Sequence, residues 1–295
     1  MTERIQKVLA RAGLGSRREV ERWIREGRVA VNNRPAELGQ QIDPSCQVAV
    51  DGRSVALAWA PSAPARILLY HKPVGQICSR DDPQGRPTVF DNLPRLRGGR
   101  WVSVGRLDLN TSGLLVFTTD GELAHQLMHP SSGIEREYRC RVRGNPGERE
   151  LKRLLAGITL GGQLCRFESV EAGRGSGANR WFRVILKEGR NREVRRMWQS
   201  VNSTVSRLIR VRYGPFRLER QHGAGECIEL TESQSAKLLQ HAGGTKASAR
   251  LQKSGRKPPG MGHGRGGESF FGFRWLTSWC IRPRKSKALP NPFTH

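Results

Sequence analysis

The sequence predicts an α+β protein with two folded domains and a basic tail. Short runs rich in β-branched and aromatic residues predict strands, and several stretches with apolar residues at helical spacing predict short helices among them. The 295 residues are enough for two domains. A Pro- and Ser-containing segment at 56–65 indicates a linker, and Gly, Pro, Ser, Lys and Arg dominate from Gly243 onward. We therefore expect one domain at 1–60 with its linker ending at about 65, a second at 66–242, and a disordered tail at 243–295.

The charge of the chain indicates a polyanionic partner. Lysine and arginine together number 51 against 26 acidic residues, which gives a formal net charge of +25. A strongly basic protein attracts polyanions, so nucleic acid is the first partner to consider. A membrane surface would attract the same charge, but the sequence has no apolar run of about 18 residues that could span a bilayer. We expect a nucleic-acid partner and no membrane.

The cysteines and histidines predict neither a disulfide framework nor a metal site. None of the six cysteines forms a Cys-x-x-Cys pair, and isolated thiols suit a reducing cytosol. His125 and His129 have metal-ligand spacing on a helix, but no third ligand is visible nearby in the sequence. The Arg-rich N-terminus has features of an organellar transit peptide, yet its several glutamates argue against one. We therefore expect a cytoplasmic protein without a metal.

The first domain is predicted to combine two short helices with short strands. Residues 4–12 carry apolar residues at helical spacing, and Ser16 and Glu19 form a capping box at the start of the second helix. The runs 29–31 and 48–50 predict strands. Six arginines lie on the opposite face of this unit: Arg11, Arg17, Arg18, Arg22, Arg25 and Arg28. Such a charge run is commonly a solvated helix face, and a surface that docks on nucleic acid is the alternative.

A polar decapeptide at 104–113 is the most informative stretch of the second domain. Apolar runs at 101–104 and 114–117 predict strands on either side, so we expect the decapeptide to form a loop. Asp108 lies in its middle, and a carboxylate on a loop held between two buried strands is well placed for chemistry. A turn aspartate is the alternative, because Asp-x-Asn-Thr-Ser-Gly is also good turn chemistry.

The remaining elements of the second domain alternate between strands and short helices. The pattern predicts strands at 67–70, 138–143, 181–186, 204–213 and 227–230, helices at 122–128, at 148–155, after Asn191 and after Thr231, and loops at 79–100 and 173–177. Four arginines crowd the start of the helix after Asn191: Arg190, Arg192, Arg195 and Arg196. Cations at a helix N-terminus oppose the helix dipole, so an anionic ligand or a buried carboxylate would account for them. A solvated helix start is the alternative.

The string around Asp108 resembles the catalytic motif of pseudouridine synthases. It runs Gly-Arg-Leu-Asp-x-x-Thr-Ser-Gly-Leu-Leu and continues to Thr-x-Asp-Gly. The N-terminal string Ser-Arg-Arg-Glu-Val-Glu-Arg-Trp-Ile-Arg-Glu-Gly-Arg resembles the S4 RNA-binding domain, and Glu-Gly-Arg-Asn-Arg-Glu-Val-Arg-Arg-Met resembles a late motif of the same synthases. The chain thus resembles the S4-domain ribosomal RNA pseudouridine synthases. The resemblance implies a small N-terminal S4 (αL-type) domain and a catalytic domain with a mixed, mostly antiparallel sheet.

The resemblance also implies roles for individual residues. Asp108 would be the catalytic residue, acting as nucleophile at C1′ of the ribose or C6 of the uracil, or as the base that takes the C2′ proton. Arg195 would pair with Asp108, and Tyr138 would stack on the target base. The substrate-binding residues would be Arg106, Val194, Lys72, Arg190 and Arg192. The six N-terminal arginines would dock on structured RNA.

The reaction implied by the resemblance isomerises a uridine to pseudouridine, and it needs no cofactor because no atom is gained. The implied partner is ribosomal RNA, and the implied target is a specific uridine of large-subunit (23S) rRNA, uridine 2605. We expect the protein to act as a monomer. A small-subunit rRNA synthase is the nearest alternative. A non-catalytic ribosome-assembly factor is another, but binding alone needs none of Asp108, Tyr138 and Arg195.

Overall fold

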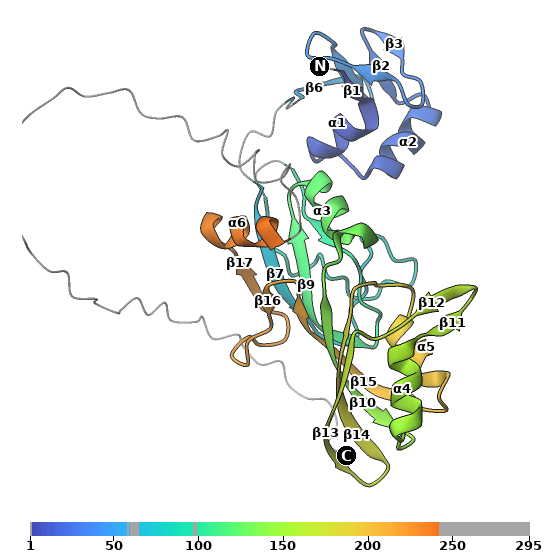
Figure 1. Cartoon of the computed structure of the whole chain (residues 1–295). Helices are drawn as coiled ribbons and strands as arrows, with labels where there is room; N and C mark the ends of the chain where they lie inside the picture. The colour runs from blue at the N-terminus through green and yellow to red at the C-terminus, as the bar shows by residue number, and fades with distance from the viewer. Residues whose placement is uncertain (1, 58, 60–64, 97–98, 242–295) are drawn as a thin grey trace, which may run out of the picture. The chain divides into compact units, whose positions relative to one another are not determined.

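The structure is a computed structural model that describes residues 2–57, 59, 65–96 and 99–241 (Figure 1). The predicted tail at 243–295 and most of the predicted linker lie outside the described residues. None of the described helices is long and apolar enough to cross a membrane.

The N-terminal part folds around its own apolar cluster. Helices α1 (Ile5–Arg11) and α2 (Arg17–Arg25) contribute residues such as Leu9 and Val20. The strands form two small antiparallel sheets: β1 (Glu3–Arg4) with β4 (Gln41–Ile42), and the sheet β3 (Arg34–Pro35), β2 (Val29–Val31), β5 (Val48–Val50) and β6 (Arg53–Val55). The predicted capping box is confirmed, because Ser16 N donates to Glu19 Oε2 at 2.6 Å and Glu19 N donates to Ser16 Oγ at 3.1 Å.

The second part is built on a nine-stranded mixed sheet. Its path runs β13 (Ser169–Ser176), β14 (Asn179–Leu186), β10 (Arg136–Arg143), β15 (Thr204–Tyr213), β9 (Thr111–Thr118), β7 (Ile67–Lys72) and β17 (Cys227–Glu229), while β8 (Val102–Val104) pairs with β9 and β16 (Phe216–Arg217) with β15. Among the described strands of this sheet, β15 and β9 are the one parallel pair. The predicted mixed, mostly antiparallel sheet is therefore confirmed.

Apolar side chains cover both faces of this sheet at β7 and β9. Successive strand residues point to opposite faces, so Leu68 joins a large cluster on one face and Leu69 a smaller cluster on the other. Helices α4 (Glu148–Ala156) and α5 (Glu193–Gln199) contribute Leu154 and Trp198 to the large cluster. Helix α3 (Gly121–Met128) contributes Leu127 to the smaller one. The remaining elements are η1 (Pro130–Ser132), the hairpin β11 (Ile158–Leu160) with β12 (Gln163–Cys165), and α6 (Glu232–His241).

Several elements differ from their predicted bounds. Strand β9 begins at Thr111, so the loop that carries Asp108 is shorter than the predicted decapeptide. Strand β13 continues through Gly173 and Gly175 of the loop predicted at 173–177, because its pairing with β14 resumes after a bulge, and Gly177 lies in the turn that follows. Helix α5 takes Arg192 rather than Asn191 as its N-cap. The hairpin β11–β12 was not predicted.

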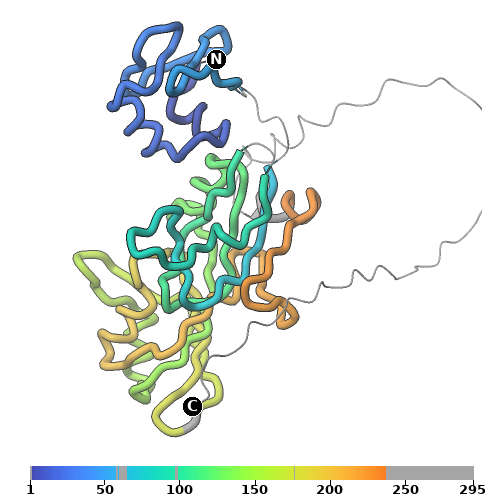
Figure 2. The backbone as a smooth tube through the Cα atoms, turned by 180° about the vertical axis from the view of Figure 1, so that it is seen from behind, coloured from blue at the N-terminus to red at the C-terminus, as the bar shows by residue number. Residues whose placement is uncertain are grey.

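The long loop predicted at 79–100 is confirmed for its described residues. They contain neither helix nor strand apart from one β-bridge, between Ile77 and Thr88. The segment is nevertheless ordered by its own hydrogen bonds, such as Thr88 Oγ1 to Asp91 Oδ1 at 2.7 Å. The teal trace in Figure 2 shows it folding back on itself rather than running extended.

Candidate active site

Five residues from five adjacent strands form a row across the sheet. Lys72 on β7 pairs with Gly113 on β9, Gly113 with Arg210 on β15, Arg210 with Tyr138 on β10, and Tyr138 with Val184 on β14. A Cβ atom on Gly113 would lie 2.2 Å from Arg210 O, so the approach of β9 to β15 requires glycine here. The row lies just inside the start of β9, next to the loop that carries Asp108.

The backbone of that loop is held at five consecutive carbonyls. The acceptors and donors are Leu107 O and Cys78 Sγ (3.3 Å), Asp108 O and Thr111 N (3.0 Å), Leu109 O and Gly75 N (3.0 Å), Asn110 O and Arg195 Nη2 (2.9 Å), and Thr111 O and Lys72 Nζ (2.9 Å). Cys78 Sγ also accepts from Leu107 N, at 3.4 Å. Donors from β7, from the segment after it and from α5 thus converge on one short stretch. The half-buried Asp108 side chain is carried by a fixed backbone.

Lys72 supports the loop from inside the protein. Its side chain is 0% exposed, and Nζ donates to Pro73 O and to Thr111 O, each at 2.9 Å. Burial lowers the pKa of this ammonium group, while the nearby carboxylate of Asp108 acts in the opposite direction. Lys72 was predicted to bind substrate. Its complete burial argues instead for a positioning role beneath the Asp108 loop.

Arg195 approaches the same loop from α5. Its Nη1 donates to Val205 O at 2.8 Å and its Nη2 to Asn110 O at 2.9 Å. Burial has the largest effect on the pKa of Arg195 and lowers it. The charge of Arg192 lowers this pKa as well, whereas the charge of Asp108 raises it. No ion pair within 4.0 Å joins Arg195 to Asp108 in the described chain. Arg195 is therefore an electrostatic neighbour of Asp108, and its guanidinium joins the loop, at Asn110 O, to strand β15, at Val205 O.

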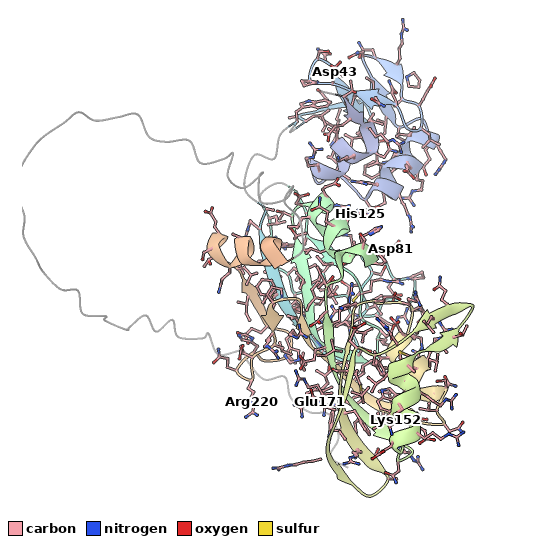
Figure 3. The ribbon with its side chains drawn as sticks, viewed as in Figure 1. Asp43, Asp81, His125, Lys152, Glu171 and Arg220 are labelled. Carbon is pink, nitrogen blue, oxygen red and sulfur yellow. The ribbon has the colours of Figure 1, made fainter. Side chains whose placement is uncertain are left out.

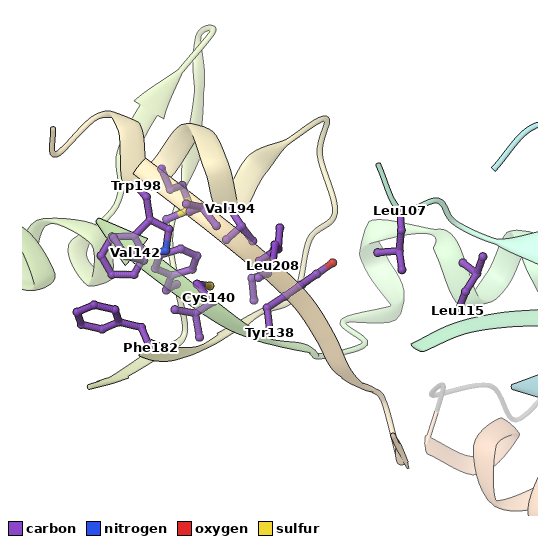
Figure 4. Close-up of a cluster of buried hydrophobic side chains, with 14 of the residues drawn as sticks. Leu107, Leu115, Tyr138, Cys140, Val142, Phe182, Val194, Trp198 and Leu208 are labelled. Carbon is purple, nitrogen blue, oxygen red and sulfur yellow. The ribbon is translucent and has the colours of Figure 1, made fainter. Parts of the chain in front are cut away.

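Tyr138 and Val194 lie together in the large apolar cluster. Tyr138 is 7% exposed and Val194 4% exposed. In Figure 4 the Tyr138 ring extends away from Cys140, with its hydroxyl directed to the side on which Leu107 is drawn. Leu107 belongs to the same cluster and precedes Asp108 directly. An apolar wall with one aromatic hydroxyl therefore adjoins the carboxylate loop.

The remaining predicted substrate-binding residues have different surroundings. Arg106 is exposed, two residues before Asp108, and Arg192 is exposed at the start of α5. Arg190 instead donates to Leu164 O at 2.7 Å and pairs with Glu188 at 2.7 Å, so it ties α5 to the β11–β12 hairpin. The structure brings Arg106 next to Asp108 and leaves Arg190 engaged in structural contacts.

Two residues of this region were missed in the sequence. Cys78 holds both backbone groups of Leu107, and burial raises the pKa of its thiol, which keeps it a hydrogen-bond donor. Arg210 is 2% exposed and donates from Nε to Leu114 O at 2.7 Å. Arg210 is a charged residue inside the apolar run of β15, and that position was the sequence signal that could have identified it. Nothing in the sequence singles out Cys78 among isolated thiols.

A metal site receives no support from the described residues. They contain no group of three or more His, Cys, Asp or Glu side chains that could hold a metal ion. His125, labelled in Figure 3, and His129 are both exposed on and just after α3. His129 Nδ1 lies 2.7 Å from Ser131 Oγ, so its ring takes part in the local turn.

Comparisons with known proteins identify the family of the chain. Residues 66–200 match the RNA pseudouridylate synthase family, and residues 3–48 match the S4 domain. The chain is 53% identical over 231 residues to ribosomal large subunit pseudouridine synthase B of Vibrio cholerae, covering 78% of this chain and 72% of the relative. The chain belongs to the RNA pseudouridylate synthase family. This synthase is therefore an isomerase with an N-terminal S4 domain, as the sequence predicted.

Other relatives extend the comparison. The synthase is 50% identical over 237 residues to the protein of the same name from Escherichia coli K12, covering 80% of this chain and 81% of that one. The synthase is 51% identical over 242 residues to the protein of the same name from Pseudomonas aeruginosa. This match covers 82% of this chain but only 63% of that longer relative. A crystal structure of a pseudouridylate synthase aligns with a TM-score of 0.55 at 26% identity, covering 80% of this chain and 99% of that chain. The fold of the synthase is thus that of its family.

If the loop of Asp108 is catalytic, as predicted, replacing Lys72 with methionine is expected to lower kcat about 100-fold with little change in KM, because a small misplacement of that loop is costly while no solvent-facing contact is lost. Steady-state kinetics on an RNA substrate would measure this. Lys152→Met is the matched control, since Lys152 on α4 is 79% exposed and pairs only with Glu148 on the same helix. A raised KM at unchanged kcat would instead indicate that Lys72 contacts the substrate.

Proposed function

We propose that this synthase isomerises a specific uridine of large-subunit rRNA, uridine 2605, with Asp108 as its catalytic carboxylate. Relatives at 50–53% identity carry the name ribosomal large subunit pseudouridine synthase B, which supports the substrate. The observation that carries the role of Asp108 is the loop with five bound carbonyls. Such a backbone presents one carboxylate at a fixed position.

The proposed reaction breaks the C1′–N1 bond of uridine, turns the uracil and joins C1′ to C5. The C5 proton leaves and N1 gains a proton, so no atom is added or lost. Asp108 forms a transient bond to C1′ or C6, or removes the C2′ proton, and each route needs one carboxylate beside the sugar and base. No redox step occurs, so the synthase needs no cofactor for this chemistry.

Two cations, the buried Lys72 and the half-buried Arg195, would assist Asp108. The charge of Asp108 alters the pKa of both Lys72 and Arg195, so each lies within electrostatic reach of the carboxylate. Their hydrogen bonds to Thr111 O and Asn110 O also orient the loop. We propose that they provide positive charge beside Asp108 before RNA binds, which avoids reorganisation during the reaction.

The target base must leave its RNA helix to reach this site. Tyr138 would stack on the uracil and Val194 would line its pocket, while Arg106 and Arg192, both exposed, would hold adjacent phosphates. Extruding a base costs a few kcal/mol, on the order expected for base-flipping enzymes. Phosphate contacts elsewhere on the basic protein would offset that cost.

We propose that residues 1–60 form the RNA-binding domain, 66–242 the catalytic domain and 243–295 a basic tail. Among the predicted RNA-binding arginines, Arg17, Arg18 and Arg25 are exposed and have no carboxylate within 4.0 Å in the described chain. The other three are engaged: Arg28 with Asp51 at 2.7 Å, Arg22 with Glu26 at 3.7 Å, and the half-buried Arg11 with Glu3. The three free arginines are therefore the stronger candidates for phosphate contacts. We also propose that the synthase acts as a monomer in the cytoplasm.

The function is tested with purified protein and two unmodified transcripts, large-subunit and small-subunit rRNA, followed by pseudouridine mapping. We expect one new pseudouridine, at uridine 2605 of the large-subunit transcript. Product in the small-subunit transcript alone would favour the alternative substrate. Tight binding to both without any product would favour a ribosome-assembly factor.

Deleting residues 1–60 is expected to weaken binding of large-subunit rRNA at least about tenfold, because the exposed arginines of this part no longer contact phosphates. Filter binding at fixed salt would measure the change. The full-length triple variant Arg17→Gln, Arg18→Gln, Arg25→Gln should reproduce most of it. An unchanged binding curve for both proteins would contradict the RNA-binding role of this domain.

A further inference from the structure

Where strands β14, β10 and β15 lie, the face of the sheet opposite the large apolar cluster carries arginines instead of a helix. Along β10, Tyr138, Cys140 and Val142 lie in the large apolar cluster, whereas the alternate residues Arg139 and Arg141 are exposed. Arg143 and, on β15, Arg207 are exposed as well. We call Arg139, Arg141, Arg143 and Arg207, together with Trp181 on β14, the outer arginine face. Helices α4 and α5 pack on the opposite face, against the apolar cluster.

The pairing of these strands places like charges opposite one another. Arg139 on β10 is directly opposite Arg183 on β14, and Arg141 is directly opposite Arg207 on β15. Like charges at such positions destabilise a sheet. Carboxylates neutralise Arg183, but Arg141 and Arg207 have none within 4.0 Å among the described residues, so a bound anion is the simplest reason for that pair.

The carboxylates on this side neutralise other arginines. Glu137 pairs with Arg183 at 2.7 Å, with Arg212 at 2.9 Å and with Arg217 at 3.5 Å. Glu171, labelled in Figure 3, is also used by Arg183, at 3.0 Å. The four arginines of the outer arginine face have no carboxylate within 4.0 Å among the described residues, so their charge is available to a partner.

An aromatic ring lies within the same surface. Trp181 is directly opposite Arg141 and half-buried, and the guanidinium carbon of Arg139 lies 5.3 Å from its ring centroid. Free guanidinium groups around an indole are suited to a phosphodiester backbone with accessible sugars and bases. An acidic protein would match the charge but would make less use of the half-buried ring.

We propose that the outer arginine face binds the backbone of a second segment of structured RNA, distinct from the one that enters the Asp108 site. The proposal rests on the proposed function, because it assumes an RNA substrate. Leu107 and Tyr138 belong to the cluster on the opposite face of the sheet, so the RNA that reaches Asp108 occupies the other side. A long rRNA provides both segments, whereas a short stem-loop provides only the target.

The test compares two variants of the full-length chain on two RNAs. Arg139→Gln, Arg141→Gln, Arg207→Gln removes three charges from the outer arginine face. Arg149→Gln, Lys152→Gln, Arg153→Gln removes three charges from α4 and controls for net charge; these residues line a shallow surface site together with Glu148. The RNAs are a large-subunit transcript and a short stem-loop that contains the target uridine. Thermal melting verifies that each variant is folded.

We expect the outer-face variant to bind the long transcript at least about tenfold more weakly, with the slope of log Kd against log salt reduced by about two to three. Its affinity and turnover on the stem-loop should stay within about twofold of wild type, and the α4 variant should change the long-transcript slope by less than about one. The proposal would be overturned if both variants lost the same affinity for the long transcript, or if the outer-face variant lost the same affinity for both RNAs. An unchanged slope of log Kd against log salt for that variant on the long transcript would also overturn it. Large ribosomal subunits that contain their proteins serve as a third ligand, and altered binding to them alone would overturn the proposal in favour of a protein partner. Wild-type protein that is inactive on both RNAs would count against the proposed function, not against this surface.

Discussion

Replacing Asp108 with asparagine is expected to reduce turnover at least about 10⁴-fold, the scale seen when an enzyme loses a residue that acts in the chemical step. The amide preserves size and hydrogen bonding but cannot serve as nucleophile or base. The loop should keep its shape, because its five bound carbonyls belong to the backbone and not to the Asp108 side chain. RNA affinity should therefore remain within about threefold of wild type.

Single-turnover assays and filter binding on the same RNA separate these two quantities. Asp81→Asn is the matched control, because Asp81 is an exposed aspartate of the long loop, labelled in Figure 3. That variant should retain turnover. Wild-type-like turnover by Asp108→Asn would remove Asp108 from the mechanism, and a parallel loss of RNA binding would indicate that it holds substrate.

Replacing Gly113 with alanine is expected to destabilise the protein by more than about 4 kcal/mol, a size reserved for severe structural conflicts. A Cβ atom there would lie 2.2 Å from Arg210 O and 2.6 Å from Arg210 N. Both are backbone atoms of β15, so no side-chain rotation relieves the contact. The φ of +112° adds strain for any residue with a side chain. The parallel β9–β15 pairing, and with it the row from Lys72 to Tyr138, should be lost.

Gly105→Ala isolates the steric part of this effect. Gly105 also has a positive φ, of +78°, but a Cβ atom added there would meet nothing within 4 Å. Its replacement should cost on the order of 1 kcal/mol from backbone strain alone. Urea denaturation of both variants measures the difference. A Gly113→Ala protein as stable as Gly105→Ala would contradict the close approach of the two strands.

Local patterns predicted much of the fold and identified the loop at the centre of the site. The Ser16–Glu19 capping box depends only on neighbouring residues, and it forms as expected. The apolar runs around Asp108 correctly predicted β8 and four of the eight residues of β9. Thr111 and Ser112 were assigned to the loop because they are polar, yet both are buried in β9 beside β15. That pairing joins segments far apart in the sequence, so local polarity could not reveal it.

The contacts that position Asp108 were less predictable for the same reason. Lys72 precedes Asp108 by many residues, and its burial depends on how β7 lies beneath the loop. The resemblance suggested a substrate contact, whereas the structure places its ammonium group on Thr111 O. Arg195 was expected at the carboxylate and instead donates to Asn110 O and Val205 O. Sequence motifs name such residues but do not specify which atoms they contact.

Pseudouridine mapping of rRNA from cells that lack this synthase tests the central claim most directly. Wild-type protein and Asp108→Asn would be restored in parallel at equal abundance. We expect loss of a single pseudouridine, at uridine 2605 of large-subunit rRNA, which returns with the wild type and not with Asp108→Asn. Return of that pseudouridine with Asp108→Asn would contradict the account.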